Sequence, residues 1–172
     1  FIGGFFAAAW IALLPLPACA DAVILHTNDV HCGVAKNIHI AAVTQYKHDL
    51  QKENPAVILV DAGDALQGEP LGSLSRGAAI IRIMNSADYD FVIPGNHEYD
   101  FGMDRFLELA SKLKCGYYSC NFIDKRTNKP VLKTHKIVTL DGKKIALIGV
   151  TTPETLISSL TKEFQDEKGK FI

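Results

Sequence analysis

The chain has 172 residues, of which 48% are hydrophobic, and its 18 basic and 19 acidic side chains give a net charge of -1 at pH 7. This length allows one domain with a substantial core, or part of a larger one, and argues against a second complete domain. The balanced charge argues against a large electrostatic footprint for nucleic acid or for an anionic membrane surface. Any charge on a substrate must therefore be met by local groups.

Residues 1–20 differ in composition from the rest of the chain. They carry no charged side chain and end in Pro-Leu-Pro-Ala-Cys-Ala before Asp21. An apolar stretch followed by an Ala-x-Ala site is typical of a secretory signal peptide. We expect residues 1–20 to be part of such a signal, truncated at its front, and the protein to be secreted, periplasmic or on the cell surface. The alternatives are a buried or membrane-spanning helix and a lipidated Cys19.

Short β-branched runs alternate with helical spacing of apolar residues after this segment. We expect strands at residues 22–25, 56–60, 91–93 and 117–120, helices over 38–50, 74–86 and 103–113, and a hairpin of 131–140 with 143–150. The hairpin is indicated by the turn signal Asp141-Gly142. Strands that alternate with helices predict the α/β class, with a largely parallel sheet covered on both faces.

Three cysteines follow the expected signal segment. Cys115 and Cys120 are candidates for a disulfide, because an export signal permits oxidation, but the sequence leaves their pairing open. Cys32 lies beside candidate site residues, and a small buried thiol is its commoner role.

Three polar segments each follow one of the first three expected strands. They are Asp29-Val30-His31, Gly63-Asp64 and Gly95-Asn96-His97-Glu98. Ligands of open α/β sheets bind outside the carboxyl ends of the strands, where loops from adjacent strands converge. One such coincidence would mean little, since Asp, Asn and Gly are common in turns. Three together predict a common site at this edge of the sheet.

The residue types in these segments suit a pair of divalent cations. Carboxylate oxygens bind hard ions, and imidazole binds several first-row metals. Two cations about 3.5–4 Å apart can hold both the attacking and the leaving oxygen of a phosphoryl group. A carboxylate between them reduces their repulsion, and Asp64 is the candidate for that bridge. Asp61 either orients a ligand through a hydrogen bond or caps the turn.

The motifs resemble those of a known family. Residues 24–31, 60–64 and 94–102 read Ile-Leu-His-Thr-Asn-Asp-Val-His, Val-Asp-Ala-Gly-Asp and Pro-Gly-Asn-His-Glu-Tyr-Asp-Phe-Gly. In this order they resemble the calcineurin-like metallophosphoesterases, and more specifically the secreted 5'-nucleotidase / UDP-sugar hydrolase family. The resemblance implies a β-sandwich flanked by helices. Residues 21–172 would be the N-terminal portion of that catalytic domain, incomplete at the C-terminus.

The resemblance also implies a set of metal ligands. Asp29 and His31 would bind the first of two divalent cations, Asp64 would bridge the pair, and Asn96 would bind the second. The identity of the ions stays open among Zn, Mn, Co, Fe, Mg and Ca.

A catalytic dyad is implied beside these ligands. His97 would stabilise the transferring phosphoryl group or protonate the leaving oxygen, and Asp100 would hold and polarise its imidazole. Water activated by the cations would attack phosphorus in line, without a covalent phosphoenzyme. Glu98 belongs to the motif, and we expect it to make a structural hydrogen bond rather than bind metal.

Members of that family complete the centre with later histidines, including a Gly-His-x-His motif, and carry a C-terminal nucleoside-binding domain. Neither is found within the 172 residues. We therefore expect this piece alone to be inactive and the function to belong to a longer protein.

Three functions follow as hypotheses. The first is hydrolysis of nucleotide phosphate esters, including UDP-sugars or 2',3'-cyclic nucleotides. The second is another metallophosphoesterase activity, such as that of a phosphodiesterase or a nuclease. The third is a non-catalytic binding module on the same fold. An enzyme is favoured because all four candidate ligands and both dyad residues are intact: Asp29, His31, Asp64, Asn96, His97 and Asp100.

Overall fold

A computed structural model describes residues 22–35 and 39–172 of the chain. The expected signal segment, residues 1–20, and the start of the first expected helix at Ile38 lie outside the described residues. The strands are β1 Val23–Thr27, β2 Val57–Asp61, β3 Phe91–Val92, β4 Ile123–Asp124, β5 Lys129–Pro130, β6 His135–Leu140 and β7 Lys143–Ile148. The helices are α1 Ile40–Glu53, α2 Pro70–Ser75, α3 Ala78–Ser86, α4 Met103–Lys112 and α5 Thr155–Ser158, with 3-10 turns η1 His97–Tyr99 and η2 Thr161–Phe164.

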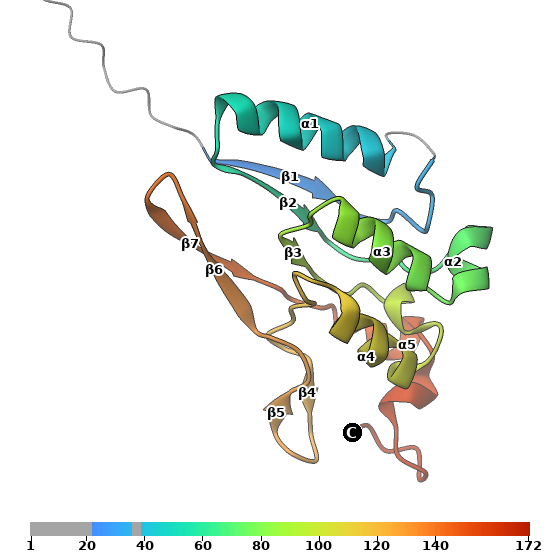
Figure 1. Cartoon of the computed structure of the whole chain (residues 1–172). Helices are drawn as coiled ribbons and strands as arrows, with labels where there is room; N and C mark the ends of the chain where they lie inside the picture. The colour runs from blue at the N-terminus through green and yellow to red at the C-terminus, as the bar shows by residue number, and fades with distance from the viewer. Residues whose placement is uncertain (1–21, 36–38) are drawn as a thin grey trace, which may run out of the picture.

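Three parallel strands in the order β1-β2-β3 form the sheet that carries the site (Figure 1). Val23 pairs with Val57 and Thr27 with Asp61, so β1 and β2 end at the same level. Asp61 in turn pairs with Val92 of β3. Parallel strands in register place their carboxyl ends along one edge, and the loops that follow must emerge side by side.

One face of the sheet is covered by helices. Buried side chains from α1, β2, α3, β3 and α4 form the main core, which includes Ile40, Leu59, Ile80, Met84, Val92, Phe106 and Leu109. Leu59, Ile80, Val92 and Phe106 have no exposed surface. No helix of residues 22–35 and 39–172 combines the length and the apolar character needed to cross a membrane.

The β6–β7 hairpin covers the other face of the sheet. Ala56 and Ile58 pack against Leu140, with Val138 and Ile145 beside them. The antiparallel register, from His135↔Ile148 to Leu140↔Lys143, confirms the hairpin predicted around Asp141-Gly142. Sheet, hairpin and helices form a mixed α/β fold, as the sequence predicts (Figure 1).

The helix predicted over residues 74–86 is two helices. Arg76 and Gly77 both have positive φ, 47° and 80°, which ends α2 and starts α3. A Cβ at position 77 would lie 2.8 Å from Cδ1 of Leu109 on α4, so a larger residue there would displace that side chain. The break lets α3 turn to pack against α4.

The strand predicted at residues 117–120 is reduced to single bridges. Tyr117 bridges Val92, and Tyr118 bridges Lys133. The next two backbone N–H groups bond to different segments, Ser119 to Lys133 and Cys120 to Gly149. The segment is buried but shared among several partners, so no continuous ladder forms. Cys115 and Cys120 are free thiols in this structure.

The core predicts a sharp contrast between two leucines of α4. Leu109 is 1% exposed and Leu107 is 38% exposed. Leu109→Ala should lower the free energy of unfolding by about 2–5 kcal/mol, because it leaves a cavity in the main core. Leu107→Ala, the same change on the same helix, should cost less than about 1 kcal/mol. Urea unfolding of the two variants measures the difference, and equal losses would contradict this packing.

Candidate metal centre

Each predicted ligand lies on a loop at the carboxyl end of the sheet. Asp29 and His31 follow β1, and Asp64 follows β2. Asn96 follows β3 and lies at the N-cap position of η1, where its side chain makes no capping hydrogen bond. The structure therefore brings together segments that are more than sixty residues apart in sequence, as their positions after parallel strands predict.

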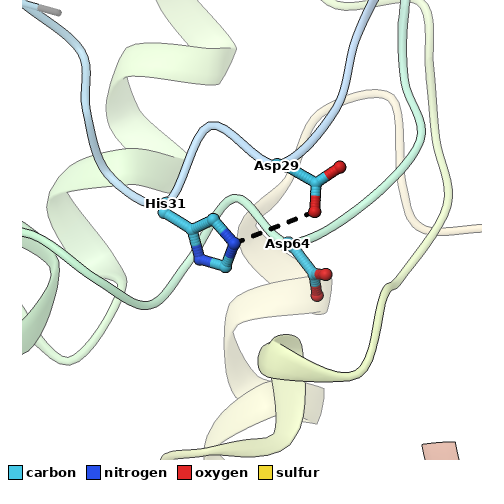
Figure 2. Close-up of side chains that lie close together, drawn as sticks. All are labelled: Asp29, His31 and Asp64. Atoms are coloured by element: carbon cyan, nitrogen blue, oxygen red, sulfur yellow. Dashed lines mark ion pairs between the residues drawn. The ribbon is translucent and has the colours of Figure 1, made fainter.

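Asp29, His31 and Asp64 form a compact cluster (Figure 2). Each offers one ligand atom, and these atoms all lie within 4.8 Å of one another. Nε2 of His31 is 3.8 Å from Oδ1 of Asp29. The side chain of Asp29 is 60% exposed and that of His31 is 38% exposed, so solvent and ions can reach the cluster. Two carboxylates and an imidazole suit Zn, Mn or Fe, and the exposure leaves room for further ligands.

Backbone hydrogen bonds hold the first two loops against each other. The N–H of Asp29 donates to the carbonyl oxygen of Gly63 at 3.0 Å, and that of His31 donates to the carbonyl oxygen of Asp64 at 2.9 Å. Asp29, His31 and Asp64 have φ values of 52°, 45° and 60°. Left-handed backbone at non-glycine residues costs free energy, and such residues cluster at functional sites. Hydrogen bonds between the two loops thus hold the backbone of Asp29 and His31 next to that of Asp64.

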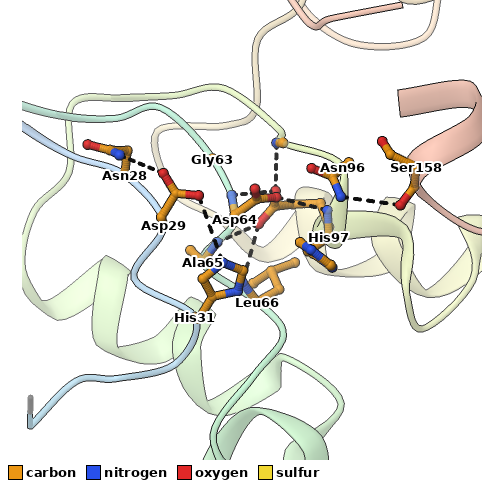
Figure 3. Close-up of polar contacts among 12 residues, drawn as sticks. Asn28, Asp29, His31, Gly63, Asp64, Ala65, Leu66, Asn96, His97 and Ser158 are labelled. Carbon is orange, nitrogen blue, oxygen red and sulfur yellow. Dashed lines mark hydrogen bonds and ion pairs between the residues drawn. The ribbon is translucent and has the colours of Figure 1, made fainter. Parts of the chain in front are cut away.

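His97 connects the third loop to the cluster. Its backbone N–H donates to Oδ1 of Asp64 at 2.8 Å. Its ring lies 5.2 Å from that of His31, measured between centroids. The neighbouring Asn96 donates from Nδ2 to the carbonyl oxygen of Ser158 at 3.4 Å (Figure 3). The third loop therefore contacts both Asp64 and the end of α5.

The imidazole of His97 is paired with Asp100, as the motif predicts. Nδ1 of His97 donates to Oδ2 of Asp100 at 2.7 Å, across the single turn of η1. This hydrogen bond raises the pKa of His97 above its ordinary value, with the charges of Asp100 and Asp64 acting in the same direction against the effect of burial. The pairing fixes the ring and leaves Nε2 as its other nitrogen.

Two carboxylates lie beneath the cluster. Asp61 is 1% exposed and accepts from the hydroxyl of Thr27 at 2.5 Å and from the N–H of Gly63 at 3.0 Å. Burial raises the pKa of Asp61 to about 7. The sequence left two roles open for Asp61, orienting a ligand or capping the turn. The hydrogen bond from Gly63 is that of a turn cap.

Glu98 is the second buried carboxylate, and its surroundings were only partly predictable. It is 1% exposed and accepts backbone hydrogen bonds from two loops, with Asp64 and Gly95 donating to Oε2. Ala65 and Leu66 donate to Oε1. The expectation of a structural hydrogen bond is confirmed. The sequence has no signal for the number of bonds or for the second loop involved.

Cys32 has the buried role expected for it. It is 2% exposed, and its thiol donates to the carbonyl oxygen of Ala65 at 3.3 Å. Burial raises the pKa of this thiol to about 11. A protonated thiol is a poor metal ligand, so Cys32 is a packing residue.

The pairing of His97 with Asp100 gives a prediction for the chain without added cations. Asp100→Asn removes the charge that stabilises the imidazolium, so His97 should lose its proton at a lower pH, toward the ordinary value of about 6.5. An NMR titration of the imidazole signals measures this midpoint. Asp104→Asn, a matched change in the first turn of α4, should leave it in place. An unchanged midpoint in Asp100→Asn would contradict the pairing.

The chain is similar to known proteins. The chain is 28% identical over 166 residues to a 5'-nucleotidase of Rattus norvegicus, and the alignment covers 84% of this chain and 29% of the rat protein. It is 33% identical over 155 residues to an NAD 5'-nucleotidase of Haemophilus influenzae, and this alignment covers 79% of this chain and 25% of that protein. The solved structure of the Haemophilus influenzae NAD nucleotidase NadN superposes with a TM-score of 0.70 and 31% identity, covering 79% of this chain and 27% of that one.

The chain spans 25% to 29% of the length of these two curated relatives. A family model described as calcineurin-like phosphoesterase matches residues 22–168, nearly all of the residues that the structure describes. The resemblance found in the motifs is therefore confirmed over residues 22–168, and the chain belongs to the calcineurin-like phosphoesterase family.

Proposed function

We propose that the protein is a metal-dependent hydrolase of nucleotide phosphate esters, with 5'-nucleotidase activity. The observation that carries this proposal is the cluster of Asp29, His31 and Asp64 beside the His97–Asp100 pair. Relatives named as 5'-nucleotidase and NAD 5'-nucleotidase support the substrate class. The proposal includes UDP-sugars and 2',3'-cyclic nucleotides as further substrates of the protein.

The ligand atoms of Asp29, His31 and Asp64 could hold one cation together, and the amide oxygen of Asn96 on the third loop supports a second in this proposal. We assign Asp29 and His31 to the first cation, Asp64 to both and Asn96 to the second, with Zn, Mn, Co, Fe, Mg or Ca as the candidates. Oδ1 of Asp64 already accepts from the N–H of His97, which orients the carboxylate toward the cluster. When bound, the cations supply Lewis acidity, which polarises a phosphoryl oxygen and lowers the pKa of water.

His97 and Asp100 supply a proton to the leaving group. Asp100 accepts the Nδ1 proton of His97, so Nε2 can donate to the leaving oxygen or to a phosphoryl oxygen. The raised pKa of His97 keeps the ring protonated to a higher pH, which suits a donor to an anion. No side chain needs to become phosphorylated in this scheme.

We further propose that the protein acts as part of a longer, exported enzyme. The chain spans 25% to 29% of two curated relatives, which supports residues 21–172 as the N-terminal portion of a catalytic domain. Further histidine ligands and a C-terminal nucleoside-binding domain are part of this proposal for the full-length protein. The composition of residues 1–20 supports export to the periplasm, the cell surface or the medium.

Substitution of one ligand and one dyad residue tests the roles. In the full-length protein with AMP and added Mn²⁺, Asp64→Asn and His97→Asn should each lower kcat about 100-fold or more, since each removes a group that acts on the reacting phosphate. The matched changes Asp49→Asn and His48→Asn on α1 should retain activity. Wild-type turnover in both site variants would refute the assignments.

Removal of divalent cations tests the metal requirement. Dialysis against EDTA should abolish release of phosphate from AMP, and Mn²⁺ or Zn²⁺ should restore it, because the chemistry depends on the cations. Full activity after chelation would refute a metal-dependent reaction. Metal binding without hydrolysis of AMP or of bis-p-nitrophenyl phosphate would favour the non-catalytic module instead.

A further inference from the structure

Glu98 lies between two of the three site loops and bonds to both. Its Oε2 accepts from the N–H of Asp64 at 2.8 Å and from that of Gly95 at 2.6 Å. Its Oε1 accepts from the N–H of Ala65 at 2.8 Å and from that of Leu66 at 3.2 Å. Both oxygens are thus saturated by donors from the loop after β2 and the loop after β3.

The backbones of the two loops approach closely at Gly63 and Gly95. A Cβ on Gly63 would lie 2.4 Å from the backbone nitrogen of Gly95. A Cβ on Gly95 would lie 2.2 Å from Oδ1 of Asp64. A buried backbone N–H without an acceptor costs free energy, so the donors at this close contact need acceptors. The carboxylate of Glu98 supplies the acceptors.

The loop after β1 is bonded to the loop after β2, one of these two loops. Asp29 and His31 bond through their backbone N–H groups to Gly63 and Asp64, next to the residues that Glu98 holds. A shift of the loop after β2 would therefore move all three clustered ligand residues relative to His97. The position of one buried carboxylate thus affects every element of the candidate site.

We propose that Glu98 is the positioning residue of the site: it sets the placement of Asp64 relative to Asn96 and His97, and so the spacing at which two cations are held. The inference rests on the proposed function. Glu98 itself binds no cation, because ligation would require it to give up hydrogen bonds that it already makes inside the core. Outer groups that orient ligands in this way usually change metal affinity or activity about 10–100-fold when replaced.

Glu98→Gln is the direct test in the full-length protein. The amide keeps the shape of the side chain but puts an NH₂ group opposite two backbone donors. Glu163→Gln is the matched control, because Glu163 also accepts a backbone N–H, from Met103 at 2.9 Å, away from the site. Mn²⁺ titration followed by EPR reports both the half-saturating concentration and the spin coupling of two neighbouring ions, and AMP hydrolysis reports kcat and KM.

We expect the half-saturating Mn²⁺ concentration to rise about tenfold or more in Glu98→Gln, with weaker spin coupling. The kcat for AMP should fall with it, while KM changes less than about twofold, since Glu98 does not touch substrate. Glu163→Gln should match the wild type. Glu98→Asp keeps the charge on a shorter chain and should lie between the two, and it decides the test if Glu98→Gln does not fold.

Wild-type Mn²⁺ half-saturation and spin coupling in a folded Glu98 variant would overturn the inference. Loss of folding in both Glu98 variants would also overturn it, because Glu98 would then be a general determinant of stability. If the wild type binds Mn²⁺ with spin coupling but does not hydrolyse AMP, the proposed function fails, and the EPR comparison still decides the role of Glu98.

Discussion

The close contact between the loops that leave β2 and β3 is the constraint on which the rest of the site depends. Gly63 and Gly95 allow the two backbones to meet, and Glu98 bonds to N–H groups of both. Buried donors that lack an acceptor cost more than an ordinary hydrogen bond contributes. The carboxylate of Glu98 therefore stabilises this contact between the loops. It also fixes the backbone position of Asp64, whose N–H it accepts.

The carboxylates of the site divide into two kinds by their surroundings. Asp61 and Glu98 are buried and bonded to hydroxyl or backbone donors, which fixes their positions. Asp29 is exposed, and Asp64 is held at one oxygen by the N–H of His97. The buried pair maintains the backbone, and the accessible pair is available for cations. Backbone hydrogen bonds hold the carboxylates of Asp29 and Asp64 near each other, and a bound cation would relieve the repulsion between them.

The fold supports this arrangement from two sides. The helices and the β6–β7 hairpin cover opposite faces of a three-stranded parallel sheet, so the strand ends cannot move independently. The site loops lie at the edge where the three strands end, which is the common place for ligands in open α/β sheets. Family membership agrees with this geometry, and the shared fold covers 79% of the chain in the NadN comparison.

The sequence alone indicated which side chains could bind metal or act in catalysis, and that each of them follows the end of a strand. Alternation of β-branched runs with helical spacing predicted the parallel sheet, and the polar segments after its strands predicted Asp29, His31 and Asp64 at one edge. Local signals of this kind depend on side-chain periodicity, which a sequence displays directly. The break at Arg76-Gly77 and the single bridges at Tyr117 and Tyr118 escaped prediction because packing partners distant in sequence decide them. Only the tertiary structure decided that Glu98 bonds to the loop after β2, since the distance between two loops depends on how the whole sheet packs.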